Sequence, residues 1–223
     1  MPESGELLTS LERITNGATT LAIVWHAVLL IAVGAVVGGA RPSRRGLAWM
    51  TVLPLLSVSA VAHWYEGRFN AFVFALLAAV VAFSVPREGD ERIRRGPTWA
   101  VVLGGAMIAF GWTYPHFLDA SRFPVAYLYA APFGLIPCPT LALLIGVNLV
   151  TGAATGIRSS VVLAAVGFFY GLVGLVRLNV EIDALLVAGA LGLLTLSLRT
   201  ATPPARREIE VTHAPNRKIE PSR

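Results

Sequence analysis

Apolar residues in this chain gather into seven long stretches, and charged residues fall between them. Most stretches hold 17 to 21 residues, enough for a helix to cross a bilayer core about 30 Å thick. They run over Thr19–Gly39, Leu47–Trp64, Phe69–Val85, Thr98–Tyr114, Val125–Thr151, Ser160–Val176 and Ile182–Leu198. The pattern predicts an all-α integral membrane protein, with a bundle of about seven transmembrane helices over residues 19–198.

Composition supports this class. The chain is 55% hydrophobic and only 14% charged, whereas a soluble domain usually carries about 25% charged residues. The formal net charge is +5, and in a membrane protein such a surplus reports which loops face the cytoplasm. We therefore expect the lipid bilayer as a partner and no nucleic acid.

The fifth stretch differs from the others because it is longer and contains prolines. It holds 27 residues, among them Pro132, Pro137 and Pro139. A proline inside a helix removes an amide donor and collides with the preceding turn. The sequence predicts a fifth helix broken at Pro137-Cys138-Pro139, with Pro139 opening a new helix and Cys138 at its cap.

The basic residues predict an orientation. With the amino terminus outside, the inner loops and the tail hold 3, 4, 1 and 6 Arg or Lys, 14 of the 18 in the chain. Only Arg13, Arg68, Arg122 and Arg177 fall on the outer side. This asymmetry is typical of a bacterial inner-membrane protein with a cytoplasmic carboxyl terminus, and it requires the fifth stretch to cross once.

The two ends of the chain have separate predictions. Residues 1–18 form an outer segment in which Leu7, Leu8, Leu11 and Ile14 recur at helical spacing, which favours an interfacial helix. Residues 199–223 are charged and rich in proline, and they predict a disordered, basic cytoplasmic tail.

Small residues recur four apart within the chain and favour close helix packing: Gly34 with Gly38, Gly152 with Gly156, Gly167 with Gly171, and Ala188 with Gly192.

Cys138 is the only cysteine, and it stands at the predicted helix break. Three interpretations stay open: a kinked helix with a small buried side chain, a soft-metal ligand or reactive thiol on a transport path, and a solute site made by freed carbonyls. The candidate substrate-binding residues are Cys138, Pro137, Pro139, Thr140 and His26.

Three histidines are predicted to share the outer face, where they could converge above Cys138, which is expected near the middle of the membrane. Imidazole and thiolate together suit copper(I) or zinc, so the candidate metal ligands are Cys138, His26, His63 and His116. A bis-histidine haem is a weaker alternative. The ordinary roles of such histidines are interfacial contacts and interhelical hydrogen bonds.

Asp183, with Arg177 and Glu181, is predicted to lie in the outer loop before the last helix.

The segment Tyr114–Gly146 resembles a bacterial family of multi-pass membrane proteins of unknown function. Its shared features are a Tyr-Pro pair, here Tyr114 and Pro115, followed by Gly-x-x-Pro-Cys-Pro-Thr, here Gly134 to Thr140. The similarity covers about a sixth of the chain. It implies a membrane location and no particular activity.

The sequence predicts a transporter of a small solute or soft metal ion, with its site at the broken fifth helix. No phosphate-binding glycine loop, nucleophile elbow or metalloprotease motif is present, so we do not expect an enzyme. One alternative is a non-catalytic structural or assembly subunit, in a homo-oligomer or a larger membrane complex. Another is a membrane protein that binds a metal or haem.

Overall fold

The structure is a computed structural model that describes residues 4–84, 93–119 and 124–201. These residues form helices and no strands, so the predicted all-α class is confirmed. The helical elements are α1 (Ser4–Gly17), α2 (Thr19–Val37), α3 (Arg44–Trp64), α4 (Arg68–Phe83), α5 (Thr98–Thr113), η1 (Pro124–Ala126), α6 (Tyr127–Ala130), α7 (Pro137–Val150), α8 (Ile157–Leu172), η2 (Val173–Arg177), η3 (Glu181–Asp183) and α9 (Ala184–Ala201).

Each of the seven predicted stretches overlaps at least one of these helices. Within the described residues, four helical segments are long and apolar enough to cross a membrane: α2, α3, Ile157–Arg177 and Glu181–Ala201. Helices α4, α5 and α7 are apolar but shorter. The 14 residues of α7 span about 21 Å, less than a bilayer core of about 30 Å.

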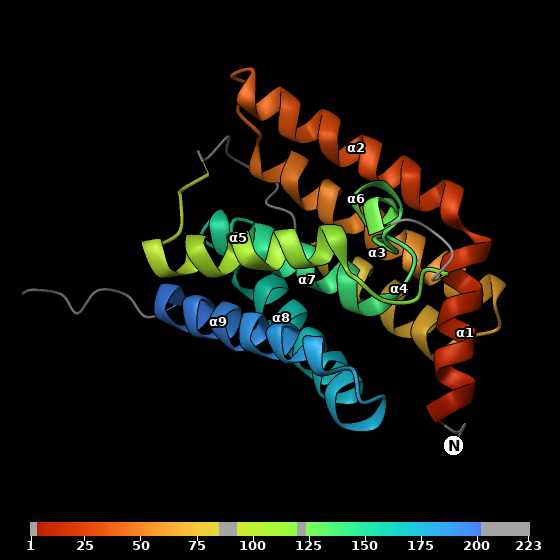
Figure 1. Cartoon of the computed structure of the whole chain (residues 1–223). Helices are drawn as coiled ribbons and strands as arrows, with labels where there is room; N and C mark the ends of the chain where they lie inside the picture. The colour runs from red at the N-terminus through yellow and green to blue at the C-terminus, as the bar shows by residue number, and fades with distance from the viewer. Residues whose placement is uncertain (1–3, 85–92, 120–123, 202–223) are drawn as a thin grey trace, which may run out of the picture.

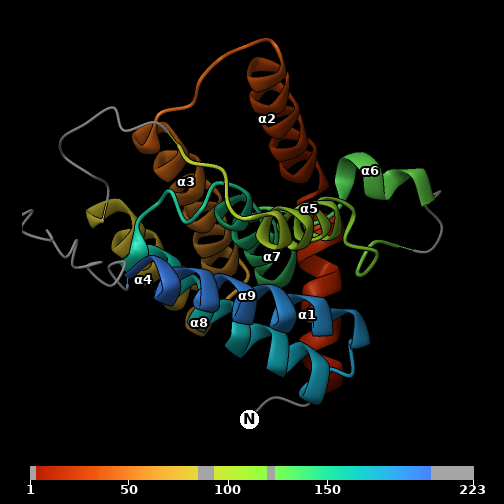
Figure 2. The same ribbon diagram turned by 90° about the vertical axis from the view of Figure 1, so that its left-hand side faces the viewer.

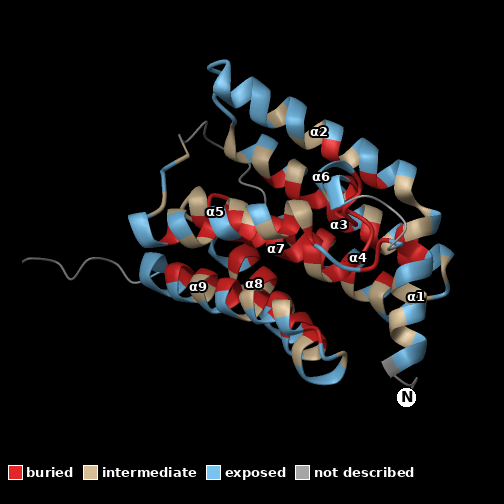
Figure 3. Ribbon diagram, viewed as in Figure 1, coloured by how far each residue is buried: buried red, intermediate tan, exposed pale blue. Residues whose placement is uncertain are grey.

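Most of the helices pack as three antiparallel pairs, α3 with α4, α5 with α7, and α8 with α9 (Figures 1 and 2). Helix α2 stands apart from these pairs, and only Ala22 and His26 along it are buried (Figure 3). Helix α1 runs across one end of the bundle, at a steep angle to α5 and α9 (Figure 1). The last three residues of α9, Arg199, Thr200 and Ala201, extend into the predicted tail, and residues 202–223 lie outside the described residues.

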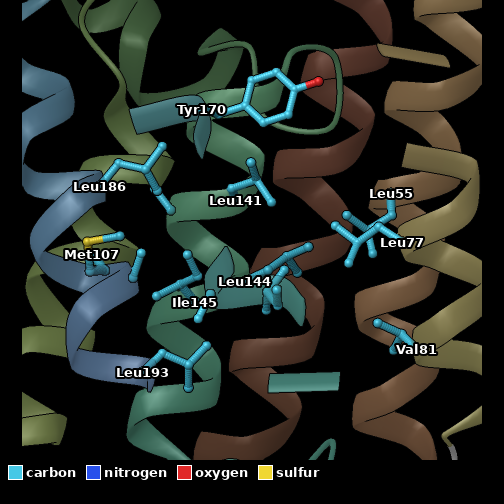
Figure 4. Packing of buried hydrophobic residues seen from close by; sticks show 14 of the residues in the cluster. Leu55, Leu77, Val81, Met107, Leu141, Leu144, Ile145, Tyr170, Leu186 and Leu193 are labelled. Carbon is cyan, nitrogen blue, oxygen red and sulfur yellow. The ribbon is translucent and has the colours of Figure 1, made fainter. Parts of the chain in front are cut away.

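Helix α7 lies at the centre of the bundle and is buried on every side. Eleven of its 14 residues are buried, whereas the other helices each expose a face. Its leucines and isoleucine meet side chains from all three pairs (Figure 4). A helix that is apolar all round belongs in the interior of a helical assembly, and this position brings the Pro-Cys-Pro segment into contact with several helices.

Glycines allow α5 and α7 to touch through their backbones. A Cβ added at Gly104 would lie 2.7 Å from the carbonyl oxygen of Gly146, and one at Gly146 would lie 2.7 Å from that of Gly104. Two helical turns further along α5, a Cβ at Gly111 would lie 2.6 Å from the carbonyl oxygen of Pro139. Small residues favour such close approach in lipid, where helix association depends on packing rather than on the hydrophobic effect.

The small-residue pairs expected from the sequence have mixed roles. Gly167 and Gly171 pack α8 against Ile145 and Val187, so this pair lies at a helix contact. A Cβ at Gly34 would meet nothing within 4 Å. Gly152 and Gly156 lie in the loop after α7, with φ of 62° and 101°, a backbone conformation that favours glycine.

The two ends of the bundle differ in character. At one end the segment before α5 contacts the end of α7, where the Gly96 amide donates to the Val150 carbonyl at 2.9 Å. The α2–α3 connection and the end of α9 lie at this same end (Figure 1), which therefore collects most of the described arginines. The opposite end carries α1, the α3–α4 turn and the start of α7.

We expect Gly104→Ala to lower the free energy of unfolding by about 1–3 kcal/mol, because the added methyl group overpacks a backbone contact. The measurement is a denaturation curve of the protein in mild detergent. Gly105→Ala is the matched control, since a Cβ there meets nothing within 4 Å. Equal stability of the two variants would contradict the proposed contact.

Candidate functional site

The interruption in the fifth stretch lies before Pro137 rather than after it. Residues 131–136 are not helical, Ile136 has extended dihedrals (φ −125°, ψ 159°), and Pro137 is the first residue of α7. The sequence had placed Cys138 at the cap and Pro139 at the first position. The observed start is two residues earlier, because Pro137 also fits the first turn of a helix, where no amide donor is required.

The non-helical segment keeps its backbone polar groups satisfied inside the bundle. The Thr140 hydroxyl donates to the Ile136 carbonyl at 2.8 Å and accepts from the Gly134 amide at 2.9 Å. From α3, the Ser57 hydroxyl donates to the Gly134 carbonyl at 2.7 Å. Trp25 of α2 in turn donates to the Ser57 hydroxyl at 2.9 Å. Irregular backbone is tolerated in a membrane interior only where protein or water satisfies it.

Gly134 is required at this point for two reasons. Its φ is +75°, which residues with a side chain rarely adopt. A Cβ there would also collide with the indole ring of Trp25. The Gly-x-x-Pro-Cys-Pro-Thr sequence therefore encodes a specific bend, in which the glycine permits the turn and the threonine hydroxyl closes it.

A cavity of about 240 Å³ lies beside the start of α7. It is formed where the ends of the three helix pairs meet, and α1 covers it with Leu7, Ser10, Leu11 and Ile14. Asn16 at the end of α1 holds this helix in place by donating to the Phe117 carbonyl at 3.1 Å. Most of the lining is apolar and aromatic: Ala62, Tyr65, Gly67, Phe69, Phe117, Ile136, Pro137, Phe169, Val173, Gly174, Leu178 and Val180.

Three polar side chains from three different elements meet at this cavity, and we call them the polar cluster: Tyr114, Cys138 and Asp183. The Tyr114 hydroxyl donates to the Asp183 carboxyl at 3.0 Å, and the Cys138 thiol interacts with both groups. Tyr114 is fully buried and Asp183 is 1% exposed, whereas Cys138 keeps some accessible surface on the cavity. A buried carboxyl group needs such partners, because its desolvation is costly.

A second polar pair lines the same cavity on the side of α4 and α8. The Tyr170 hydroxyl donates to the Asn70 side-chain oxygen at 2.7 Å. Just beyond Tyr170, α8 widens into the π-helical turn Val173–Arg177, and Gly174 in this turn lies directly against the Asp183 carboxyl group. Short π-helical turns occur often at functional sites, and here a side chain at Gly174 would displace Asp183.

The structure brings only some of the predicted substrate-binding residues to the cavity. Cys138 and Pro137 line it. Pro139 and Thr140 are buried behind them, and Thr140 braces the bend. His26 does not line the cavity. It lies between α2 and α5, with its ring nitrogens 2.8 Å from the Ala22 carbonyl oxygen and 3.0 Å from that of Trp112.

The predicted metal-ligand set is not assembled. Among the described residues, no group of three or more His, Cys, Asp or Glu is placed to hold a metal ion. His26 is occupied between two helices, and His63 is exposed at the last turn of α3. His116 is also exposed. The three histidines come from separate elements, and their predicted position on one side of the bundle does not bring them together at Cys138.

The sequence did not identify the polar cluster as a site. It placed Tyr114 and Asp183 at the outer face and Cys138 near the middle of the membrane, whereas all three residues line the same cavity in the structure. Their convergence depends on the bend at residues 131–136 and on the turn before α9. No spacing rule within one helix could have signalled it, since the three residues come from different elements.

Comparison of the chain with protein-family models, with curated proteins and with solved structures gives no match. The resemblance of Tyr114–Gly146 to a family with a Gly-x-x-Pro-Cys-Pro-Thr motif stays a prediction.

We expect Thr140→Val to lower the free energy of unfolding by about 1–3 kcal/mol, because the buried Gly134 amide would lose its acceptor. Thermal unfolding in mild detergent measures the effect. Thr195→Val is the control: its hydroxyl also bonds a carbonyl four residues earlier, but at an exposed position. A loss no larger than that of the control would show that the hydroxyl does not hold the bend.

Proposed function

We propose that this chain is a seven-span protein of the bacterial inner membrane that binds a small solute in the cavity beside Cys138 and takes part in its transport. The amino terminus is outside and the carboxyl terminus is cytoplasmic. In this topology α1 lies on the outer membrane surface, and the shorter helices α4 and α5, together with α6–α7, complete the seven crossings.

The cavity is the observation that carries this proposal. Drug-sized ligands occupy pockets of about 300–1,000 Å³, lined mainly by apolar and aromatic side chains with a few polar groups. The cavity here has this lining but a volume of about 240 Å³, which suits a smaller solute. Its polar groups gather on two sides, where they can orient a bound molecule.

The arrangement of charges supports the proposed topology. The described arginines gather mainly at the end of the bundle opposite the cavity (Figure 1). Cytoplasmic loops carry an excess of Arg and Lys, so the cavity end would face outward. The half of the bundle toward the arginine-rich end is filled by the packed core around Leu144, Ile145 and Leu149. The cavity in this conformation is therefore a pocket and not a channel.

A soft metal ion is a poorer candidate for the solute than a small organic molecule. Copper(I) and zinc require several thiolate or imidazole ligands, and among the described residues these are not grouped. An apolar cavity with hydroxyl, amide and carboxyl groups suits an amphipathic molecule instead. The remaining candidate solutes are therefore organic molecules with a compact apolar part.

The second candidate, a structural or assembly subunit, is favoured by the position of α2. This helix is apolar on all sides, and its outer surface is covered by no other described element. A partner subunit could pack there, with Gly34 at the contact. If so, Gly34→Leu would dissociate a complex that is stable in mild detergent, and a protein that is monomeric throughout purification would exclude this candidate.

We expect the small alcohol 3,3-dimethylbutan-1-ol to slow alkylation of Cys138 by N-ethylmaleimide, because both enter the same cavity. Cys138 is the only cysteine, so the wild-type protein in lipid nanodiscs reports directly on this position by mass spectrometry. Ala62→Phe, which fills the cavity, should slow labelling and abolish protection. Ala75→Phe, at an exposed position of α4, is the control and should behave as wild type.

Two outcomes would overturn the proposal. One is labelling of Cys138 only after denaturation, which would mean that no solute reaches the cavity. The other is labelling that the alcohol never slows at any concentration the protein tolerates. If Ala62→Phe does not fold, Leu11→Trp fills the cavity from α1 and provides the same comparison.

A further inference from the structure

The cavity combines a buried carboxyl group with a lining rich in aromatic rings. Six aromatic side chains line it: Tyr65, Phe69, Tyr114, Phe117, Phe169 and Tyr170. Five of them pack in two groups, with ring centroids 6.1 Å apart for Tyr114 and Phe117, 6.3 Å apart for Phe69 and Phe169, and 5.4 Å apart for Phe169 and Tyr170. An aromatic face attracts a cation through its quadrupole, most strongly where the cation has lost its water.

Asp183 places a carboxyl group at the same cavity. Asp183 is 1% exposed, and its carboxyl group accepts a hydrogen bond from the Tyr114 hydroxyl at 3.0 Å. An ionised carboxyl group in such a position is costly unless a positive charge is close. A cationic solute in the cavity would supply that charge next to the aromatic rings.

The lining also selects the kind of cation. Hard metal ions such as Ca²⁺ require six or more oxygen ligands, and the cavity offers few oxygens beside a mostly apolar surface. A substituted ammonium group is weakly hydrated and carries its own apolar substituents. Its charge can therefore lie near Asp183 while its methyl groups contact the rings.

We propose that the solute of this cavity is a small organic cation, of the substituted-ammonium class, held by Asp183 and the surrounding aromatic rings. This inference rests on the proposed solute-binding function and adds the chemical class of the solute. Asp183 binds the charge, and Phe117 and Tyr170 contact the alkyl groups. The Tyr114 hydroxyl keeps the carboxyl group in position.

The test uses a pair of molecules that have the same shape but differ in charge. Choline has the skeleton of 3,3-dimethylbutan-1-ol with a positively charged nitrogen in place of the quaternary carbon. We expect choline to protect Cys138 from N-ethylmaleimide at a concentration at least about tenfold lower than the alcohol, a ratio that corresponds to about 1.4 kcal/mol. The alcohol partitions into lipid better than choline does. Partitioning alone would therefore make the alcohol the stronger protectant, the opposite of the expected result.

Variants locate the effect. Asp183→Asn should remove the preference for choline while leaving protection by the alcohol, and Phe117→Leu should reduce the preference. Glu181→Gln is the matched control, because Glu181 lies two residues away in the same turn but is exposed. If Asp183→Asn does not fold, the comparison of choline with the alcohol in the wild-type protein and in Phe117→Leu still tests the inference.

The outcomes separate this inference from the proposed function. Equal protection by both molecules in the wild type, or a preference for choline that persists in Asp183→Asn, would overturn the cation inference and leave solute binding intact. Protection by neither molecule would overturn both. If Glu181→Gln loses the preference for choline as fully as Asp183→Asn does, the preference comes from the charge of the outer surface, and the inference is overturned.

Discussion

A short stretch of backbone without helical hydrogen bonds lies in the interior of this bundle, and the helices around it are arranged to satisfy it. Residues 131–136 receive partners from the Ser57 and Thr140 hydroxyl groups, and Trp25 extends the connection to α2. In a membrane, a backbone group without a partner costs several kcal/mol. This requirement fixes where α2 and α3 lie relative to α7, and it sets the direction in which Cys138 enters the bundle.

The cavity follows from the same bend. Because α7 begins at Pro137 and is only 14 residues long, its first turn lies below the end of the bundle, and the neighbouring helices extend past it. The space above that turn is closed by α1 and by the segment between η2 and α9. Polar side chains that would be costly in lipid meet there and satisfy one another.

Sequence reasoning succeeded where the physics is local. Apolar runs and charged gaps placed the helices to within a few residues, since α5 was expected at Thr98–Tyr114 and is observed at Thr98–Thr113. It failed where several helices have to meet. His26, His63 and His116 share a side of the bundle but not a site, because a side chain's direction depends on helix rotation. The rotation of α5 against α7 is set by three glycines. Gly104 and Gly111 lie seven residues apart on α5, and Gly146 lies on α7.

The contact between α5 and α7 also limits how the bundle can change shape. Where the α5 and α7 backbones approach at the glycines, the contact leaves little room for side chains to slide or repack, so we expect this pair to move as one body. The α3–α4 and α8–α9 pairs meet that body through leucine and other flexible side chains. Under the proposed transport function, opening the cavity toward the cytoplasm would therefore require rocking of the outer pairs against a fixed central pair.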